Sequence, residues 1–412
     1  MEGKLHVTLV TSAQPSANPR LVKEAKSLLQ AGYVVSVIWC PISTWADGFD
    51  HQLFDHLQEI NWIKVGYHSK SQPFSYLYSR IRQKVWQVVF KIIGNQFDAS
   101  IKSLVLYSQE LKAEVLKRSS NLYIGHNLGV LPAIVKASEK YNAKCIFDFE
   151  DFHRGENESE SLTSLKIKTI EEKYIPLVNT LTAASILIKQ EYLKYFKKNI
   201  TTINNCFSVK YISNNLKINV NIPLKLFWFS QYIGKKRGLE TVLYAMSQLP
   251  TGSVSLTLMG FATSHIKQYF QKINTDLNLN ESQLIFIDPV QEKEIAKIAS
   301  EHHIGLCSEY AHIKNRDLCL TNKIFFYLLA GNALLISDTK AQKYFIQENP
   351  NIGQLYIQEN VFSLVEAIRY YYNNPSILNT HRINALQLAR NKYNWELEQI
   401  KFLAIVRNNL FT

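Results

Sequence analysis

The chain has 412 residues, 46% of them hydrophobic and 12% aromatic, which is enough apolar material for two packed cores and excludes intrinsic disorder. Lysine and arginine outnumber aspartate and glutamate by 46 to 34, and the resulting net charge of +12 favours anionic partners. Zinc-finger spacings, RNA-binding aromatic signatures and basic zippers are absent from the sequence, so we expect no nucleic-acid partner.

The first 205 residues alternate between buried strands and amphipathic helices. Residues 4–11 (KLHVTLVT) predict a strand, residues 18–32 a helix that begins at a proline and ends at a glycine, and residues 33–40 a second strand. The same patterns predict strands at 121–126, 143–150 and 179–185 and helices at 130–141 and 186–196. Short buried strands separated by helices indicate a parallel sheet that is covered on both faces.

Residues 206–223 (CFSVKYISNNLKINVNIP) lose this alternation and are rich in asparagine and lysine, so we expect a linker there. The alternation restarts in residues 224–390, which we expect to form a second domain. Its strands are expected at 224–230, 254–260, 284–288, 304–308 and 333–337. Residues 391–412 predict a C-terminal helix that packs back on the domain of residues 1–205.

The expected fold is α/β, with two Rossmann-like doubly wound domains, an interdomain cleft and C-terminal helices. Ligands in such folds bind outside the carboxyl ends of the strands.

Several common classes of site are missing from the sequence. The five cysteines are scattered singly without a CxxC pair, which fits neither a disulfide framework nor a zinc site and favours a reducing cytoplasm. A run of 18 apolar residues and a signal-peptide pattern are both lacking, so we expect a soluble or peripheral protein. Neither GxGxxG after the first strand nor GxxxxGK[ST] occurs, which argues against dinucleotide oxidoreductases and P-loop enzymes.

The stretch LTNKIFFYLLAGNALLISDT, residues 320–339, predicts a helix that starts near Thr321 and is ended by Gly331, followed by a buried strand. The start of such a helix exposes N–H groups that attract anions, and Lys323 adds a full charge there. An ordinary capped core helix with a solvated lysine has the same pattern, so this stretch alone leaves both interpretations open.

A second basic segment, SQYIGKKRGLE, follows the first predicted strand of the second domain. Gly234 permits a tight approach of the backbone, and Lys235, Lys236 and Arg237 stand where the loop meets a helix. Two sets of cations in one domain suit a diphosphate, although a solvated basic turn would look the same in isolation.

The order of these segments resembles the donor domain of GT-B glycosyltransferases similar to family four, the retaining group. The matching segments are KRGLETVLYAMSQLP, VSLTLMG, LTNKIFFYLLAGNALLISDT and ARNKYNWELEQIKFL, and NPRLVKEAKSLLQAGYVVSVI and HNLGVLPAIVKASEKYNAKCIFDFEDFHRGE are similar in the first half. The resemblance spans nearly the whole chain. It implies transfer of a sugar from a nucleotide-diphosphate sugar, UDP- or GDP-sugar above all, to a sugar or lipid-linked acceptor. It also implies a retaining mechanism without metal or cofactor, in agreement with the absence of an Asp-x-Asp motif.

The resemblance assigns roles to individual residues. Lys236 and Arg237 match the residues that hold the donor's diphosphate, and Asn322 and Lys323 match the helix start near the same group. The resemblance also places His126 opposite the donor sugar, although a satisfied core or surface histidine is the alternative. In the first loop, Arg20 is expected to face the cleft, with a surface position at the helix start as the alternative.

The chain departs from this family at two positions. Relatives carry two glutamates eight residues apart, the second of which binds the donor ribose, but here these positions are Leu318 and Phe326. We expect Glu309 to be the nearest acidic substitute, with Arg316 close to it in sequence. Phe326 is either a core residue or packs beside the base or sugar.

The loop after residues 143–150 contains further polar candidates. Glu150 and Asp151 stand where relatives often have a His-Glu pair, so we expect them to contact acceptor hydroxyls or to act as a base; strand-end caps are the alternative. His153 shares this loop and is a weaker candidate for the acceptor side or the cleft.

Residues 74–97 combine four cations with aromatic and aliphatic side chains and contain no aspartate or glutamate. This composition fits a helix at the inner face of the cytoplasmic membrane and equally a buried helix with a basic outer rim. A membrane contact would favour a lipid-linked acceptor and a role in surface polysaccharide or glycolipid assembly.

Two rival functions stay open at this stage. One is a non-catalytic GT-B scaffold, for which Leu318 and Phe326 are the evidence. The other is a nucleotide-sugar epimerase or a phosphorylase on the same fold.

Overall fold

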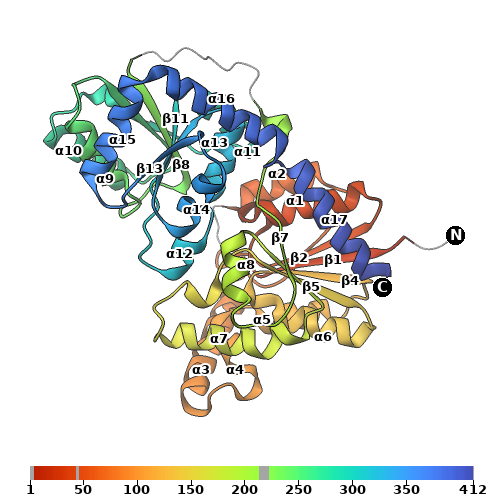
Figure 1. The fold of residues 1–412 in the computed structure, drawn as a ribbon. Helices are drawn as coiled ribbons and strands as arrows, with labels where there is room; N and C mark the ends of the chain where they lie inside the picture. The colour runs from red at the N-terminus through yellow and green to blue at the C-terminus, as the bar shows by residue number, and fades with distance from the viewer. Residues whose placement is uncertain (1–3, 43–45, 213–221, 412) are drawn as a thin grey trace. The chain divides into compact units, whose positions relative to one another are not determined.

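The computed structural model describes residues 4–42, 46–212 and 222–411, which form two compact units (Figure 1). Unit 1 contains the chain up to Asn204 together with Ile313–Asn315 and the C-terminal segment from Gln399. Unit 2 contains Asn205–His312 and Arg316–Glu398. Each unit is a parallel sheet with helices on both faces, which confirms the predicted α/β fold of two Rossmann-like domains.

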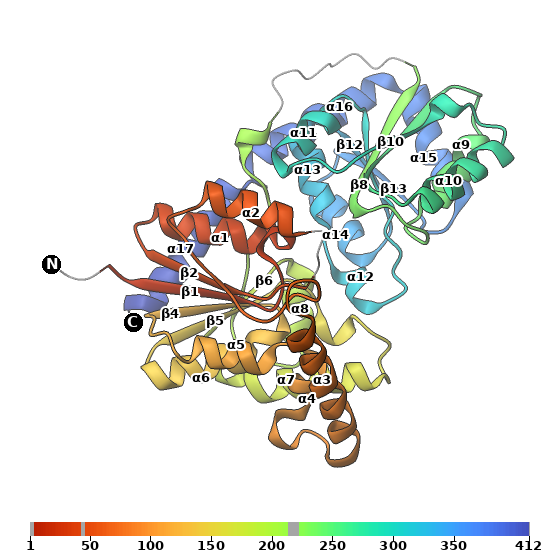
Figure 2. The ribbon, with the colours of Figure 1, turned by 180° about the vertical axis from the view of Figure 1, so that it is seen from behind.

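The sheet of unit 1 has seven parallel strands in the order β3-β2-β1-β4-β5-β6-β7. The strands are β1 (His6–Thr11), β2 (Val34–Trp39), β3 (Asn61–Lys64), β4 (Leu122–His126), β5 (Lys144–Phe149), β6 (Thr180–Ala183) and β7 (Ile200–Thr202). The helices are α1 (Pro19–Gln30), α2 (Asp47–His56), α3 (Pro73–Ile93), α4 (Ala99–Leu104), α5 (Ser108–Val115), α6 (Leu131–Tyr141), α7 (Leu162–Tyr174) and α8 (Ile186–Tyr192). Figure 2 shows α1 on one face of this sheet and α5, α6 and α7 on the other.

The sheet of unit 2 has six parallel strands in the order β10-β9-β8-β11-β12-β13. The strands are β8 (Leu224–Tyr232), β9 (Val254–Phe261), β10 (Leu284–Ile287), β11 (Ile304–Cys307), β12 (Ala333–Ser337) and β13 (Gly353–Tyr356). The helices are α9 (Leu239–Ser247), α10 (Ser264–Asp276), α11 (Glu292–Ser300), α13 (Asn322–Ala330), α14 (Lys340–Glu348), α15 (Val361–Asn373) and α16 (Pro375–Asn391). Helix α12 (Lys314–Leu318) begins in unit 1 and ends in unit 2. The last helix, α17 (Trp395–Phe411), begins in unit 2 and ends in unit 1.

The three strands that the sequence analysis did not anticipate, β3, β7 and β13, all lie at sheet edges. They are three or four residues long, and their sequences NWIK, ITT and GQLY contain no continuous apolar run. An edge strand has a neighbour on one side only and needs no fully buried sequence, so periodicity gives it little signal.

Most of the predicted linker, residues 213–221, lies outside the described residues. Cys206 and Phe207, which precede that stretch, are buried in the core of unit 2. On the C-terminal side, Asn409 of α17 accepts a hydrogen bond from the hydroxyl of Thr180 in unit 1 (2.9 Å).

Unit 2 has one core layer on each face of its sheet, because successive side chains of a strand point to opposite faces. In β8, Leu226 and Trp228 pack into the layer that includes α9 and α15, whereas Phe227 and Phe229 pack into the layer that includes α11, α13 and α16. All the side chains of α13 after Asn322 are buried. A helix that is apolar around almost its whole circumference fits this central position.

Phe326 is a core residue and not an exposed ring beside a ligand. Its ring stacks on Phe207 with the centroids 3.8 Å apart and meets the edge of Phe229 at 5.4 Å. The side chain is 3% exposed. The apolar contacts on both sides explain why a carboxylate at this position would be poorly accommodated here.

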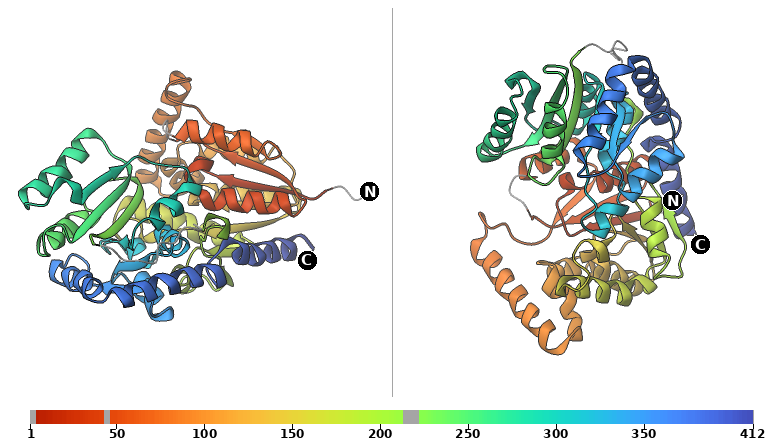
Figure 3. Two further views of the ribbon diagram at one scale, coloured as in Figure 1. Left: turned by 90° about the horizontal axis from the view of Figure 1, so that it is seen from above. Right: turned by 60° about the vertical axis from the view of Figure 1, so that its left-hand side comes forward.

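Helix α3 is the longest helix of unit 1 and lies beside α4 at the periphery of that unit (Figure 3). Over the described part of the chain, the helices are all too short or too polar to cross a bilayer.

We expect Phe326→Ala to destabilise unit 2 by about 3 to 5 kcal/mol, because it removes a buried ring and leaves a cavity between Phe207 and Phe229. Native-state hydrogen exchange of the α13 amides measures this loss locally. The matched control is Phe362→Ala in α15, whose ring is 75% exposed and whose removal should change exchange little. Equal protection in the two variants would contradict the core assignment of Phe326.

Candidate functional site

The strand order reverses once in each sheet, next to β1 and β4 in unit 1 and next to β8 and β11 in unit 2. At such a point the loops after the two central strands leave in opposite directions and form a crevice beyond their carboxyl ends. Most of the sequence-predicted site residues lie in these loops or in the helices that follow them. These residues form two groups, one in each unit.

In unit 1, His126 at the end of β4 lies between two carboxylates. Its Nδ1 is 2.9 Å from Oε1 of Glu150, and its Nε2 is 3.1 Å from Oε2 of Glu24 in α1. The imidazole is completely buried. His126 is therefore a paired internal group in this structure rather than one with a free ring nitrogen.

His126 carries a positive charge in this setting. Burial alone would lower its pKa, but the charges of Glu24 and Glu150 and the hydrogen bonds to them raise the pKa to about 10. Both ring nitrogens then carry protons, and neither can accept one near neutral pH. The charge of His126 holds Glu150 and Glu24 in place.

Arg20, predicted to face a cleft, is also buried, and it completes this charge cluster. Its guanidinium binds Asp148 in β5 through two nitrogens (2.6 and 2.7 Å), donates to the carbonyl oxygen of Ile203 (2.5 Å) and lies 3.5 Å from Glu24. Thr182 donates a further hydrogen bond to Asp148 (2.5 Å). Two cations thus alternate with three carboxylates, an arrangement that offsets part of the penalty for burying charge.

Glu150 is the member of the cluster that reaches solvent, with its side chain 17% exposed. Besides His126, the amides of Asn18 and Asn127 donate to its carboxylate at 2.6 and 3.1 Å. Three donors fix the carboxylate without covering it completely. Glu150 is thus held by one charged partner and two amides, and part of its carboxylate stays open to solvent.

Asp151 and His153 occupy different surroundings. Asp151 accepts a hydrogen bond from the side-chain amide of Asn315 (3.0 Å). His153 is buried, and its Nδ1 binds Glu156 at 2.7 Å. Burial would lower the pKa of His153, but Glu156 raises it to about 9.

His126, Asp148 and Glu150 are the one group of metal-ligating type found in the described part of the chain, with donor atoms within 4.8 Å of one another. Arg20 already binds Asp148, and the protonated ring of His126 offers no lone pair. A metal ion would have to displace one cation and deprotonate the other, so the donor set fits a metal poorly.

In unit 2, the corresponding cluster surrounds Glu309, which follows β11. Lys323 at the start of α13 donates to its Oε1 (2.5 Å), and Arg316 of α12 donates to its Oε2 (3.0 Å). Burial would raise the pKa of Glu309, but Lys323 and then Arg316 and Arg237 lower it to about 2. The predicted ribose-binding acid therefore has both carboxylate oxygens occupied by cations.

Arg237 lies on the other side of the crevice, in the loop after β8. Its guanidinium donates to the hydroxyl of Ser230 (3.1 Å), while its Nε is buried without a hydrogen-bond partner among the described residues. Arg237 and Lys323 both approach the ring of Trp228, at 5.7 and 5.3 Å from its centroid. The unused donor of Arg237 can serve an anion, whereas the ring of Trp228 stabilises the two cations that approach it.

The backbone after Arg237 approaches the loop after β11 closely. Gly238 has a φ of 78°, and a Cβ there would lie 2.5 Å from the carbonyl oxygen of Ser308. The hydroxyl of Ser308 donates to the carbonyl oxygen of Arg237 (2.6 Å). Only glycine allows this conformation and this approach at low cost, so Gly238 ties Arg237 to the strand that precedes Glu309.

Two predicted donor-binding residues remain outside this cluster. Lys236 is exposed, has a φ of 58°, and donates its backbone N–H to Glu240 (3.2 Å). Asn322 is exposed at the first turn of α13 and accepts a hydrogen bond from Asn205 (2.9 Å). The structure thus brings together Arg237, Lys323, Glu309 and Arg316.

Sequence reasoning missed the residues that support these groups: Asn18, Glu24, Asn127, Asp148 and Trp228. One signal was available in β5, because Asp148 is a charged residue within the otherwise apolar run CIFDF. Another was the four-residue spacing of Arg20 and Glu24, which places them on one helix face.

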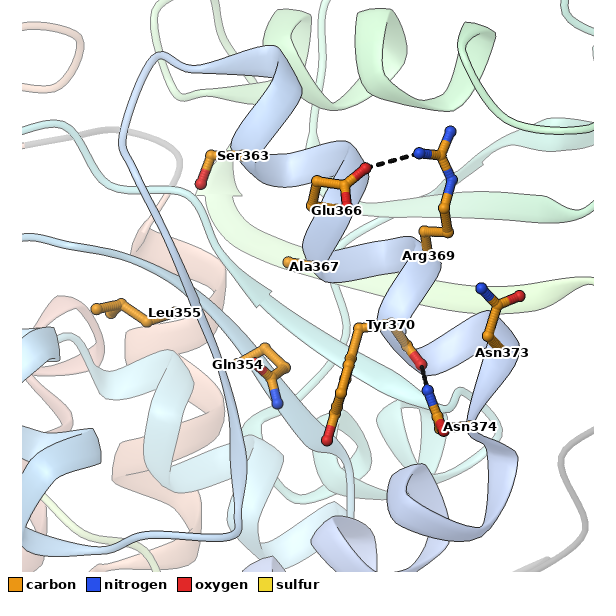
Figure 4. Close-up of a pocket in the computed structure, with 9 residues that line it drawn as sticks. All are labelled: Gln354, Leu355, Ser363, Glu366, Ala367, Arg369, Tyr370, Asn373 and Asn374. Atoms are coloured by element: carbon orange, nitrogen blue, oxygen red, sulfur yellow. Dashed lines mark hydrogen bonds and ion pairs between the residues drawn. The ribbon is translucent and has the colours of Figure 1, made fainter.

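A shallow pocket between β13 and α15 is separate from the predicted residues (Figure 4). Its charged groups, Glu366 and Arg369, pair with each other at 2.6 Å, and Asn374 donates to the carbonyl oxygen of Tyr370. These polar groups bind one another and leave little for a ligand.

The search of protein families finds no model that matches the chain, and curated protein sequences include no detectable relative. Solved structures nevertheless match it along nearly its whole length. A glycosyltransferase from Rickettsia africae has a TM-score of 0.70 at 16% identity and covers 100% of both chains. Sucrose-phosphate synthase from Thermosynechococcus elongatus has a TM-score of 0.71 at 14% identity, over 98% of this chain and 99% of the other.

Anabaena HepE in complex with UDP is a third match, with a TM-score of 0.69 at 12% identity over 98% of this chain and 100% of the other. At such identities the likeness concerns the fold. The chain therefore has the GT-B fold of these glycosyltransferases.

We expect the free energy of unfolding of unit 1 to fall as the pH rises from about 6.5 to 10. This fall should be larger in the wild-type protein than in the His126→Gln variant. The raised pKa of His126 means that the folded state holds a proton that the unfolded state releases in this interval. The stabilisation is complete below pH 6.5 and is lost above pH 10. Urea midpoints of both proteins across this range measure the effect, and parallel profiles would contradict a charged His126.

Glu309 should behave in the opposite way. We expect Glu309→Gln to be about 3 kcal/mol less stable at pH 7, because it leaves two cations facing each other. The difference should shrink as the pH falls from about 4.5 towards 2, where the wild-type carboxylate takes up its proton. Urea unfolding between pH 7 and 3 tests this, with Glu348→Gln as the control, because the Glu348 side chain at the end of α14 is exposed. A pH-independent difference would refute the assignment.

Proposed function

We propose that this protein is a glycosyltransferase that transfers a sugar from a nucleotide-diphosphate sugar to an acceptor hydroxyl. The observation that carries the proposal is the cluster of Arg237, Lys323 and Arg316 around Glu309, beyond the carboxyl ends of β8 and β11. Three cations against one carboxylate leave an excess positive charge where this class of sheet binds ligands. The complexes of HepE with UDP and with UDP-glucose support a nucleotide sugar as the ligand class.

The donor's diphosphate would lie against Arg237 and the start of α13. Lys323 has three N–H donors and uses one on Glu309, and the guanidinium of Arg237 has a buried Nε without a partner among the described residues. The helix start adds backbone N–H groups and a partial positive charge. Glu309 is a positioning residue in this proposal, because it fixes Lys323 and Arg316 before the donor arrives.

These groups would promote the reaction by stabilising the leaving diphosphate. Negative charge grows on the leaving group as the bond to the sugar breaks, and cations that are already in place lower the barrier without reorganisation. Fixed cations can supply this stabilisation, so we propose a metal-independent reaction. We further propose that it retains the configuration of the sugar, with the acceptor hydroxyl approaching on the side of the diphosphate.

Unit 1 would supply the acceptor side. Glu150 is held by His126, Asn18 and Asn127 and is partly open to solvent, so we propose that it binds an acceptor hydroxyl or takes its proton. His126 acts through Glu150 in this proposal and not as a base, because its raised pKa keeps it protonated. Asp151 stays a weaker candidate for the same contact, and we propose a sugar or a lipid-linked sugar as the acceptor.

A second function is favoured by one observation. Phe326 is buried against Phe207, and Leu318 is also buried, at the positions where relatives carry glutamates. A protein without these acids could bind a nucleotide sugar and serve as a scaffold subunit.

Incubation with UDP-, GDP-, TDP- and ADP-sugars and candidate acceptors separates the functions. Transfer or hydrolysis supports the transferase, isomerised sugar supports an epimerase, and nucleotide binding without turnover supports the scaffold.

We expect Arg237→Ala to lower turnover by about a hundredfold or more, because the loss of one preorganised charge contact raises a barrier by roughly 2.7 to 4 kcal/mol. The matched control is Lys235→Ala in the same loop, whose ammonium lies 3.9 Å from the ring centroid of Tyr269 and outside the cluster. Steady-state turnover of both variants is measured with the nucleotide sugar that the wild-type protein uses in the panel of UDP-, GDP-, TDP- and ADP-sugars. Near-normal turnover of Arg237→Ala would remove this residue from the mechanism.

A further inference from the structure

Helix α3 exposes a continuous apolar stripe. Its members follow one another at intervals of three or four residues, which places them within about 80° of arc on the helix. They are Phe74, Tyr78, Ile81, Val85, Val88 and Ile92, and each is more than half exposed. Phe74 is 86% exposed and Ile92 75%. Apolar side chains in a row of this length are unusual on a surface that only water contacts.

The opposite side of α3 faces unit 1. Ser79 and Phe90 are buried, and Trp86 lies under the ammonium group of Lys102, 4.1 Å from its ring centroid. The helix contacts α4 on this side. The apolar stripe is therefore not the face that anchors α3 to the rest of the unit, and a buried helix with a basic outer rim is not what the structure contains.

Cations line one flank of the stripe. Arg80, Lys84 and Lys91 lie within about 40° of arc, roughly 100° around the helix from the stripe. All three are exposed, and they form no ion pair among the described residues. The fourth cation of the helix, Arg82, lies on the other flank and binds Glu110 at 2.5 Å. The helix contains no acidic residue from Pro73 to Ile93.

We propose that α3 is a docking surface for a membrane that contains anionic lipids, with the helix lying in the plane of the interface. The stripe would enter the boundary between headgroups and acyl chains, and Arg80, Lys84 and Lys91 would lie at the depth of the lipid phosphates. Charge complementarity selects this occupant, because an apolar face flanked by unpaired cations matches an apolar layer covered by anions. This proposal concerns where the protein is held and does not depend on sugar transfer.

A second copy of the chain is the rival occupant, because intervals of three and four residues also suit helix pairing. Pairing two α3 helices would bring two rows of like charges towards each other, and the unpaired cations have no acidic complement on the same helix. The charge pattern therefore favours a lipid surface over self-association.

The test is co-sedimentation of the full chain with vesicles of phosphatidylcholine alone and of phosphatidylcholine mixed with phosphatidylglycerol. We expect binding to the mixed vesicles at about 0.05 M salt and weak binding at about 1 M salt, where screening shortens the range of charge interactions to about 3 Å. Replacing Arg80, Lys84 and Lys91 by glutamine should weaken binding about a hundredfold. Ile81→Glu combined with Val85→Glu should weaken it at least tenfold.

Matched controls keep the experiment specific. Replacing the exposed Lys272, Lys293 and Lys297 of unit 2 by glutamine changes the net charge equally, and Phe362→Glu changes an exposed ring on α15. Both controls should bind like the wild type, and circular dichroism confirms that every variant is folded. Sedimentation that is equal for control and α3 variants, or absent with anionic vesicles, overturns the proposal. A dimer in light scattering that Ile81→Glu dissociates, without vesicle binding, overturns it in favour of the second copy.

Discussion

The ion pair between Lys323 and Glu309 is the interaction on which the candidate donor site depends. Without the carboxylate, Lys323, Arg316 and Arg237 would repel one another at the carboxyl ends of β8 and β11, where burial limits their contact with water. With it, the cations stay at fixed points and retain unused N–H donors. The geometry follows from the parallel pairing of β11 with β8 and β12, which brings the loop of Arg237 and the start of α13 to the same edge.

Unit 1 uses the same physical solution with the signs arranged differently. Three carboxylates there are interleaved with Arg20 and His126, and the chain of charges runs from the interior at Asp148 to the partly exposed Glu150. This arrangement changes the role of the histidine. His126, which the sequence predicted to lie opposite the donor sugar, is here the internal partner of two carboxylates, and Glu150 is the member of the cluster that reaches solvent.

The fold class and much of the order of elements could be predicted from the sequence. Buried strands in parallel sheets are short apolar runs, and runs such as VSLTLMG and ALLIS are visible without any tertiary information. The start and end of α13 could also be predicted, because threonine is a residue type that commonly precedes a helix and Gly331 adopts the left-handed conformation that ends one; the side chain of Thr321 makes no capping hydrogen bond here. The edge strands and the role of supporting residues such as Glu24 could not be predicted from the sequence, because distant parts of the chain form their surroundings.

By itself the sequence determined that there are two α/β units, that cations gather in the loops and helix starts of unit 2, and that residues 74–97 are apolar and basic. Only the tertiary structure decided which of these groups meet. It buried Phe326, joined Lys323 and Arg316 to Glu309, placed Arg237 and Lys323 at the same ring of Trp228, left Lys236 outside, and turned the apolar side of α3 to solvent. The physical reason is that composition and spacing fix the faces of an element, whereas the packing of remote elements selects which face is covered.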